Sequence, residues 1–144
     1  MLRDPRPFDP EKLWTLFQSD LGAVLRGKGF FWVASQPASC LQWSRAGRGN
    51  EIGRGGTWWA AAPRSAWPTD PEILQQIEAR WHPYFGDRGQ ELVFIGLASE
   101  LDRAALEAKI RACLIEDWRF GDGWSGDDPF SELLDPSRGR EESE

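Results

Sequence analysis

The sequence holds few of the residues that build metal centres and disulfide frameworks. Among its 144 residues are two cysteines, Cys40 and Cys113, a single histidine, His82, and one methionine. One histidine cannot supply a His-rich metal site, and the two cysteines lie too far apart in sequence to form the close pair that seeds a zinc site. We therefore expect no bound metal. The scarcity of cysteine also indicates a reduced, cytoplasmic setting.

Long apolar runs are missing as well. No run approaches the roughly 18 residues of a membrane-spanning helix, and the first residues lack the apolar stretch of a secretory signal. Hydrophobic residues make up 40% of the chain and charged residues 28%. This composition is typical of soluble globular proteins, and the length corresponds to one domain.

The net charge of −6 is unevenly spread along the chain. Residues 116–144 hold ten acidic residues against three arginines, whereas residues 26–64 hold six basic residues against a single acid, Glu51. The middle of the chain is therefore basic and its C-terminal end acidic. We expect a domain over residues 6–130, followed by a disordered, solvated acidic tail over residues 131–144.

Three helices are predicted from capping signals and apolar spacing. Asp9-Pro10-Glu11 combines an N-cap acid with a proline at the first helical position, and apolar residues then recur at helical spacing over about residues 10–26. Asp70-Pro71-Glu72 repeats the same device before a helix that ends ahead of Pro83. Asp102 can cap the third helix.

Short apolar or alternating segments predict the strands. A hairpin turn is expected at Gly55-Gly56, and Leu92-Val93-Phe94-Ile95 is the best candidate for a buried central strand. The predicted strands are residues 30–34, the alternating stretch around Leu41 and Trp43, residues 57–62 and residues 92–95. The order α-β-β-β-β-α-β-α predicts an α+β domain, in which a mostly antiparallel sheet of four to five strands carries helices packed on one face.

Two segments come close to known ligand-binding motifs and fail them. Residues 22–29 approach the phosphate-binding loop pattern, but Gly29 stands where a hydroxyl must bind magnesium, and the context is wrong. Residues 122–128 are acidic, but Trp124 and Gly126 occupy positions where a calcium loop needs ligands. Because no nucleophile, base and oxyanion donor can be named together, we expect neither an enzyme nor a cofactor.

Nine tryptophans are unusual in so short a chain. Trp58 and Trp59 are adjacent in a predicted strand, so their side chains should point to opposite faces. One of these two tryptophans should therefore face away from the helices. Together with Trp43 and the basic residues in the middle of the chain, it could stack the bases of single-stranded RNA or DNA on an open sheet face. A second domain or subunit that covers this face explains exposed tryptophan equally well.

Several ordered blocks of the sequence resemble the C-terminal domain of the CobW family over residues 6–130. The blocks are Arg6-Pro7-Phe8-Asp9-Pro10-Glu11-Lys12-Leu13-Trp14, Leu25-Arg26-Gly27-Lys28-Gly29-Phe30-Phe31-Trp32, Trp43-Ser44-Arg45-Ala46-Gly47, Trp58-Trp59-Ala60-Ala61, Gly86-Asp87-Arg88-Gly89-Gln90-Glu91-Leu92-Val93-Phe94-Ile95-Gly96 and Asp128-Pro129-Phe130. The family often has histidine where Asp9 stands and glutamine where Arg45 stands. The loss of the histidine argues against metal binding by this domain.

The resemblance implies an accessory domain of a GTP-dependent metal chaperone, a group linked to zinc homeostasis, cobalamin synthesis or nitrile hydratase maturation. In that family GTP hydrolysis and the cysteine metal motif belong to an N-terminal P-loop domain. We therefore expect a non-catalytic module that docks on a P-loop GTPase domain, in the same polypeptide or a separate one, or on a metal-client protein. The predicted partner-binding residues are Arg26, Lys28, Trp43, Arg45, Trp59, Asp87, Arg88, Gln90 and Glu91. Nucleic acid is the less favoured partner, and no membrane is expected.

Overall fold

Five antiparallel strands form one sheet in the computed structural model, which describes residues 2–19, 21, 24–47, 49–97, 99 and 101–131. The strands lie in the order β1-β5-β2-β3-β4. They are β1 (Leu2–Asp4), β2 (Val24–Phe31), β3 (Ser39–Ala46), β4 (Gly49–Thr57) and β5 (Gln90–Gly96). The helices are α1 (Pro10–Gln18), α2 (Pro71–Ala79) and α3 (Arg103–Arg111), with short 3-10 turns at Trp59–Ala61, Arg64–Ala66 and Phe120–Asp122. This architecture confirms the predicted α+β fold class.

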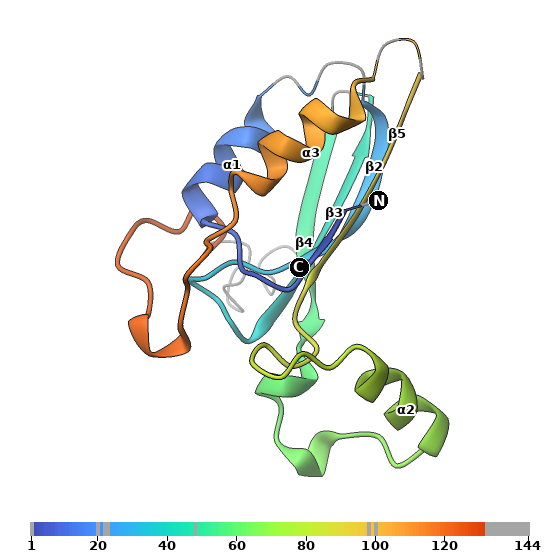
Figure 1. The fold of residues 1–144 in the computed structure, drawn as a ribbon, viewed down its shortest axis with the longest axis vertical. Coiled ribbons are helices and arrows are strands. Elements are labelled where there is room, and N and C mark those ends of the chain that lie inside the picture. The colour runs from blue at the N-terminus through green and yellow to red at the C-terminus, as the bar shows by residue number, and fades with distance from the viewer. Residues whose placement is uncertain are drawn as a thin grey trace, which may run out of the picture.

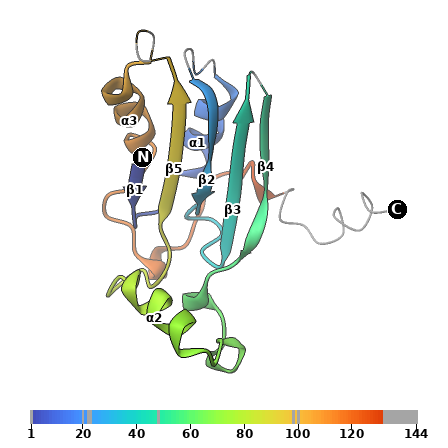
Figure 2. The ribbon, with the colours of Figure 1, turned by 90° about the vertical axis from the view of Figure 1, so that its right-hand side faces the viewer.

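The helices take two different positions relative to the sheet. α1 and α3 lie side by side on one face (Figure 1), where Leu13, Phe17 and Ile110 enter the main core. α2 lies beyond one end of the sheet, in a segment that also carries the first two 3-10 turns. Figure 2 looks onto the other face of the sheet, and no helix of the described residues crosses it. One face of the sheet is therefore open.

All three helices begin where the sequence predicts. The Asp9 carboxylate accepts hydrogen bonds from the backbone N–H groups of Glu11 and Lys12, at 3.0 and 3.2 Å. Asp70 and Asp102 cap α2 and α3 in the same way. Each cap satisfies a backbone donor that has no partner within the first helical turn.

The first helix is shorter than the predicted range of residues 10–26. α1 ends at Gln18, and the chain forms β2 from Val24 onward. Gly27 and Gly29, which lie beyond the end of the predicted helix, are inside this strand. A Cβ atom on Gly27 would lie 2.6 Å from Cζ3 of Trp43, and one on Gly29 would overlap the backbone of β5. Both glycines therefore permit close packing within the sheet layer.

The hairpin expected at Gly55-Gly56 forms elsewhere. β3 and β4 are joined around Gly47, whose φ of 61° lies in the left-handed region that glycine adopts readily. The predicted strand over residues 57–62 is likewise wrong, because β4 ends at Thr57 and a 3-10 turn begins at Trp59. Trp58 and Trp59 are thus not strand neighbours on opposite faces.

Two aromatic clusters hold the layers together. In the main core, Trp43 stacks on Phe17 with ring centroids 5.1 Å apart and planes 3° apart. Phe130 packs edge-on against Trp14 at 5.2 Å, which ties the C-terminal described segment to α1. The second cluster surrounds Trp32, which directly follows β2. Rings of this size contribute much of the apolar burial in a small domain.

Candidate functional site

The open face of the sheet carries side chains of β2, β3, β4 and β5. Side chains alternate between the two faces of a strand, so the neighbours of the buried Leu92 and Phe94 point away from the helices. The cross-strand pairs on the open face are Arg26 with Ile95, Lys28 with Val93 and Phe30 with Glu91. Charged and apolar side chains therefore lie opposite one another across the two strands.

Apolar side chains are exposed at the end of the sheet that lies away from α2. Leu25, Ile95 and Leu97 are 47%, 56% and 52% exposed. Their exposure corrects the prediction of a fully buried strand over residues 92–95. A continuous apolar run looks the same in a sequence whether its second face is covered by its own chain or left open. Exposed branched side chains on neighbouring strands are typical of a surface that another macromolecule covers.

A shallow groove of about 690 Å³ crosses the middle of the open face. Gly29 on β2 and Gly53 on β4 contribute to its floor, and Lys28 is among its charged lining residues. A second hollow of about 480 Å³ lies toward α2 and shares Phe30 and Glu91 with the first. The two hollows adjoin, and together they form a depression that extends from the sheet toward the α2 segment.

Three of the nine predicted partner-binding residues lie on this open face. Arg26 and Lys28 are exposed, and Glu91 is half-buried. The Glu91 carboxylate forms ion pairs with Arg3 at 2.8 Å and with Arg80 at 3.6 Å. Ion pairs with such exposed arginines contribute little to stability, so Glu91 can exchange them for contacts with a partner. Arg26 and Lys28 are exposed and can also turn toward a partner.

Three other predicted residues are buried, so they cannot serve as contact residues on the surface. Trp43, Gln90 and Arg45 are 1%, 2% and 6% exposed. Trp43 was expected to be an exposed anchor, but the pleat of β3 turns it toward the helices, where its indole N–H donates to Asn50 Oδ1 at 3.2 Å. Arg45 Nη1 donates to the same oxygen at 3.2 Å. Both residues support the fold.

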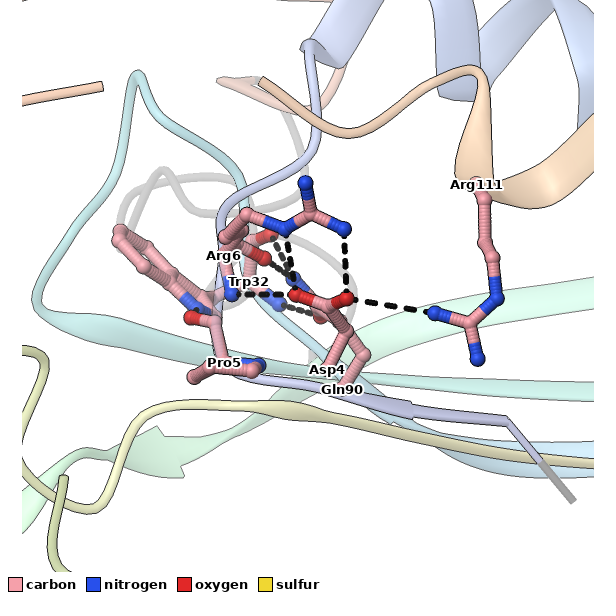
Figure 3. A network of polar contacts seen from close by, with 6 residues as sticks. All are labelled: Asp4, Pro5, Arg6, Trp32, Gln90 and Arg111. Carbon is pink, nitrogen blue, oxygen red and sulfur yellow. Dashed lines mark hydrogen bonds and ion pairs between the residues drawn. The ribbon is translucent and has the colours of Figure 1, made fainter. Parts of the chain in front are cut away.

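Gln90 belongs to a polar network that holds β1, a strand missed from the sequence (Figure 3). Its Oε1 accepts from the backbone N–H of Trp32 at 2.8 Å, and its Nε2 donates to the carbonyl oxygen of Arg6. Asp4 accepts from Arg6 Nη2 at 2.8 Å and from Arg111 Nη1 at 3.3 Å. Burial raises the pKa of Asp4, but the hydrogen bonds and charges of both arginines outweigh it and hold the pKa below its usual value. The network fixes β1 against β5 and α3.

The last three predicted residues, Trp59, Asp87 and Arg88, join the sheet to the α2 segment. The Asp87 carboxylate accepts hydrogen bonds from the backbone N–H groups of Trp59 and Ala60, both at 2.8 Å. The Arg88 guanidinium lies 4.6 Å from the ring centroid of Phe120, and burial lowers its pKa although the Asp87 charge opposes this effect. These residues therefore orient the α2 segment.

The three tryptophans expected to stack bases do not form a platform on the open face. Trp43 and Trp58 are buried, and Trp59 lies in the joint to α2. Acidic residues Glu51 and Glu91 also line the groove beside Lys28, so the face is not uniformly basic. Single-stranded nucleic acid binders need both aromatic platforms and a positive groove. The nucleic acid alternative therefore loses the observations on which it depended.

Within the described residues, no group of three or more histidine, cysteine or acidic side chains is placed to hold a metal ion. Burial, together with the charge of Asp87, raises the pKa of Cys40 to about 11, which disfavours the thiolate that binds metals.

No helix in the described part of the chain is both long and apolar enough to cross a membrane.

The family model described as the C-terminal domain of the cobalamin synthesis protein cobW matches residues 1–114. The chain belongs to this CobW C-terminal domain family. It is 34% identical to the zinc-regulated GTPase metalloprotein activator 1 of Dictyostelium discoideum over 142 residues, which cover 96% of this chain and 29% of that protein. It is 29% identical to the zinc chaperone Rv0106 of Mycobacterium tuberculosis over 144 residues, covering 90% of this chain and 35% of that protein.

Two solved structures are similar to this chain, and the one with a TM-score of 0.50 agrees with the assignment at the level of the fold. The Zn(II)-bound YjiA GTPase from E. coli and a Zn(II)-bound triple mutant of YjiA GTPase give TM-scores of 0.49 and 0.50, each at 17% identity. They match 78% and 79% of this chain, and 28% of the YjiA chain in both cases. The CobW C-terminal domain thus spans about a third of the length of the curated relatives it matches.

Proposed function

We propose that this chain is the non-catalytic accessory domain of a cytoplasmic GTP-dependent metal chaperone. In this role, its open sheet face docks on the GTPase domain. Membership in the CobW C-terminal domain family supports the first part, as do the relatives that are a GTPase metalloprotein activator and a zinc chaperone. The chain covers only 29% and 35% of those two proteins, which leaves room for a GTPase domain in the same polypeptide.

The observation that carries the docking proposal is the exposed apolar group on the uncovered face. Leu25, Ile95 and Leu97 are about half exposed, although they stand on or beside strands whose opposite faces form the main core. Burial of apolar side chains such as these contributes favourably to association. Arg26 and Lys28 lie beside them, and charges in this position fix orientation and accelerate encounter.

Direct titration of the chain with the GTPase domain, loaded with GTP or GDP, tests this proposal. Ile95→Asp should weaken binding at least tenfold, because an aspartate buried in an apolar contact loses its hydration without gaining a partner. Ile73→Asp is the matched control, since Ile73 is 41% exposed but lies on α2, beyond the end of the sheet.

Two results would contradict docking through the open face. One is the absence of binding by the unmodified chain in both nucleotide states, which would direct the search to a metal-client protein. The other is an equal or larger loss with Ile73→Asp, which would move the contact to the α2 segment. Far-UV circular dichroism of both variants checks that the fold is retained.

A further inference from the structure

β4 forms one edge of the sheet, and its outer side lacks a strand partner among the described residues. Its nine residues are exposed or half-buried along their whole length, and they include four glycines and no proline. A strand edge offers a row of free N–H and C=O groups that can pair with another strand. Small side chains also let another backbone approach closely.

The other edge of the same sheet is protected. β1 has only three residues, and two of them, Arg3 and Asp4, are charged. Short length and charged side chains are the usual devices that prevent edge pairing. β1 also lies at the opposite side of the sheet from β4.

We propose that β4 pairs with β4 of a second copy of this chain, antiparallel and two-fold symmetric about Ile52. The charges on the strand fit this register. Its charged residues are Glu51 and Arg54, which lie on opposite faces. The register places Glu51 opposite Gly53 of the second copy and Arg54 opposite Asn50, so no like charges lie directly opposite one another.

The sterics of the strand fit the same register. A side chain on Gly53 would meet nothing within 4 Å, so the space beside it can accept Glu51 of the second copy. Ile52 is half-buried and packs on the main core from the edge. In the dimer the two Ile52 side chains meet on the two-fold axis and extend the main core across the interface. Cross-strand pairs of β-branched residues such as this one are favourable. An isologous contact of this kind closes at two copies.

Light scattering and sedimentation of the full 144-residue chain test the association. The unmodified chain should have twice the mass of one copy at high micromolar concentration. Ile52→Lys should yield monomers, because it brings two ammonium groups together on the axis, whereas Ile52→Thr keeps a β-branched residue and should remain dimeric. A monomeric unmodified chain overturns the proposal, as does a dimer that Ile52→Lys leaves unchanged.

Cross-linking decides the register even if Ile52→Lys fails to fold. Paired residues in antiparallel strands have Cα atoms about 4.5–5.5 Å apart, within disulfide range, whereas the two copies of residue 54 would be roughly 13 Å apart. With Cys40→Ser and Cys113→Ala as background, diamide should therefore cross-link Ile52→Cys rapidly and Arg54→Cys poorly. Equal cross-linking of both variants overturns the register.

The dimer and the proposed docking can fail separately. Ile52→Lys should leave binding to the GTPase domain unchanged, because Ile52 packs on the main core at the β4 edge, whereas Ile95 lies on β5 at the far side of β2 and β3. If the chain is monomeric and Ile52→Lys abolishes GTPase binding, the β4 edge belongs to the GTPase domain and self-pairing is wrong.

Discussion

Gly29 provides a direct test of how closely β2 and β5 are packed beneath the open face. It pairs with Leu92 of β5 and with Trp43 of β3. In Gly29→Ala, the added Cβ would lie 2.9 Å from both the carbonyl carbon of Glu91 and Cα of Leu92. These are backbone atoms, so no side chain can rotate away. β5 cannot retreat either, because Leu92 is fully buried against the helices.

Overpacking of this kind costs about 1–3 kcal/mol, and we expect the upper end because the clash is with backbone. For a chain of this size, a loss of 3 kcal/mol lowers Tm by roughly 10 °C. Thermal and urea unfolding, followed by tryptophan fluorescence, measures the change. Gly53→Ala is the matched control, since its Cβ meets nothing within 4 Å and should change stability by less than about 0.5 kcal/mol. Equal stability of the two variants would refute the packing argument.

Two further predictions concern titratable groups. Asp4→Asn should destabilise the chain by about 1–2 kcal/mol at neutral pH. Because the folded pKa of Asp4 is lowered, the stability of the unmodified chain relative to this variant should be constant above about pH 5 and shrink as pH falls below about 4; a difference that persists at low pH in urea titrations would contradict the network. Cys40 should react with iodoacetamide at pH 8 on the order of 100-fold more slowly than a free thiol, because its pKa is raised to about 11. An unretarded rate for Cys40, followed by peptide mass spectrometry, would show that the thiol is not buried as described.

Local signals in the sequence predicted part of this fold well. The three aspartate caps, the helix starts and the α+β class depend on short-range chemistry, and all are confirmed. The errors occur where a distant partner decides the conformation. Gly27 and Gly29 are ordinary helix terminators in a sequence, but here they accommodate the Trp43 indole and the β5 backbone.

At the candidate site, too, local signals were read correctly from the sequence, whereas contacts with distant residues were not. Charged residues near a turn are easy to identify, yet Asp87 and Arg88 proved to form a joint within the chain, and Trp43 proved to be core. The exposed face of Ile95 could not be predicted, because its strand is as apolar as one covered on both sides. Only the positions of α1 and α3, on a single face of the sheet, reveal that side chains on the other face are uncovered.

Hydroxyl-radical footprinting of the chain, alone and with the GTPase domain, measures the docking surface most directly. The proposed function predicts that oxidation of Leu25 and Ile95 falls sharply in the complex, while oxidation of Ile73 on α2 stays unchanged. Unchanged oxidation of Leu25 and Ile95 at saturating GTPase domain, or protection confined to Ile73, would contradict docking through the open face of the sheet.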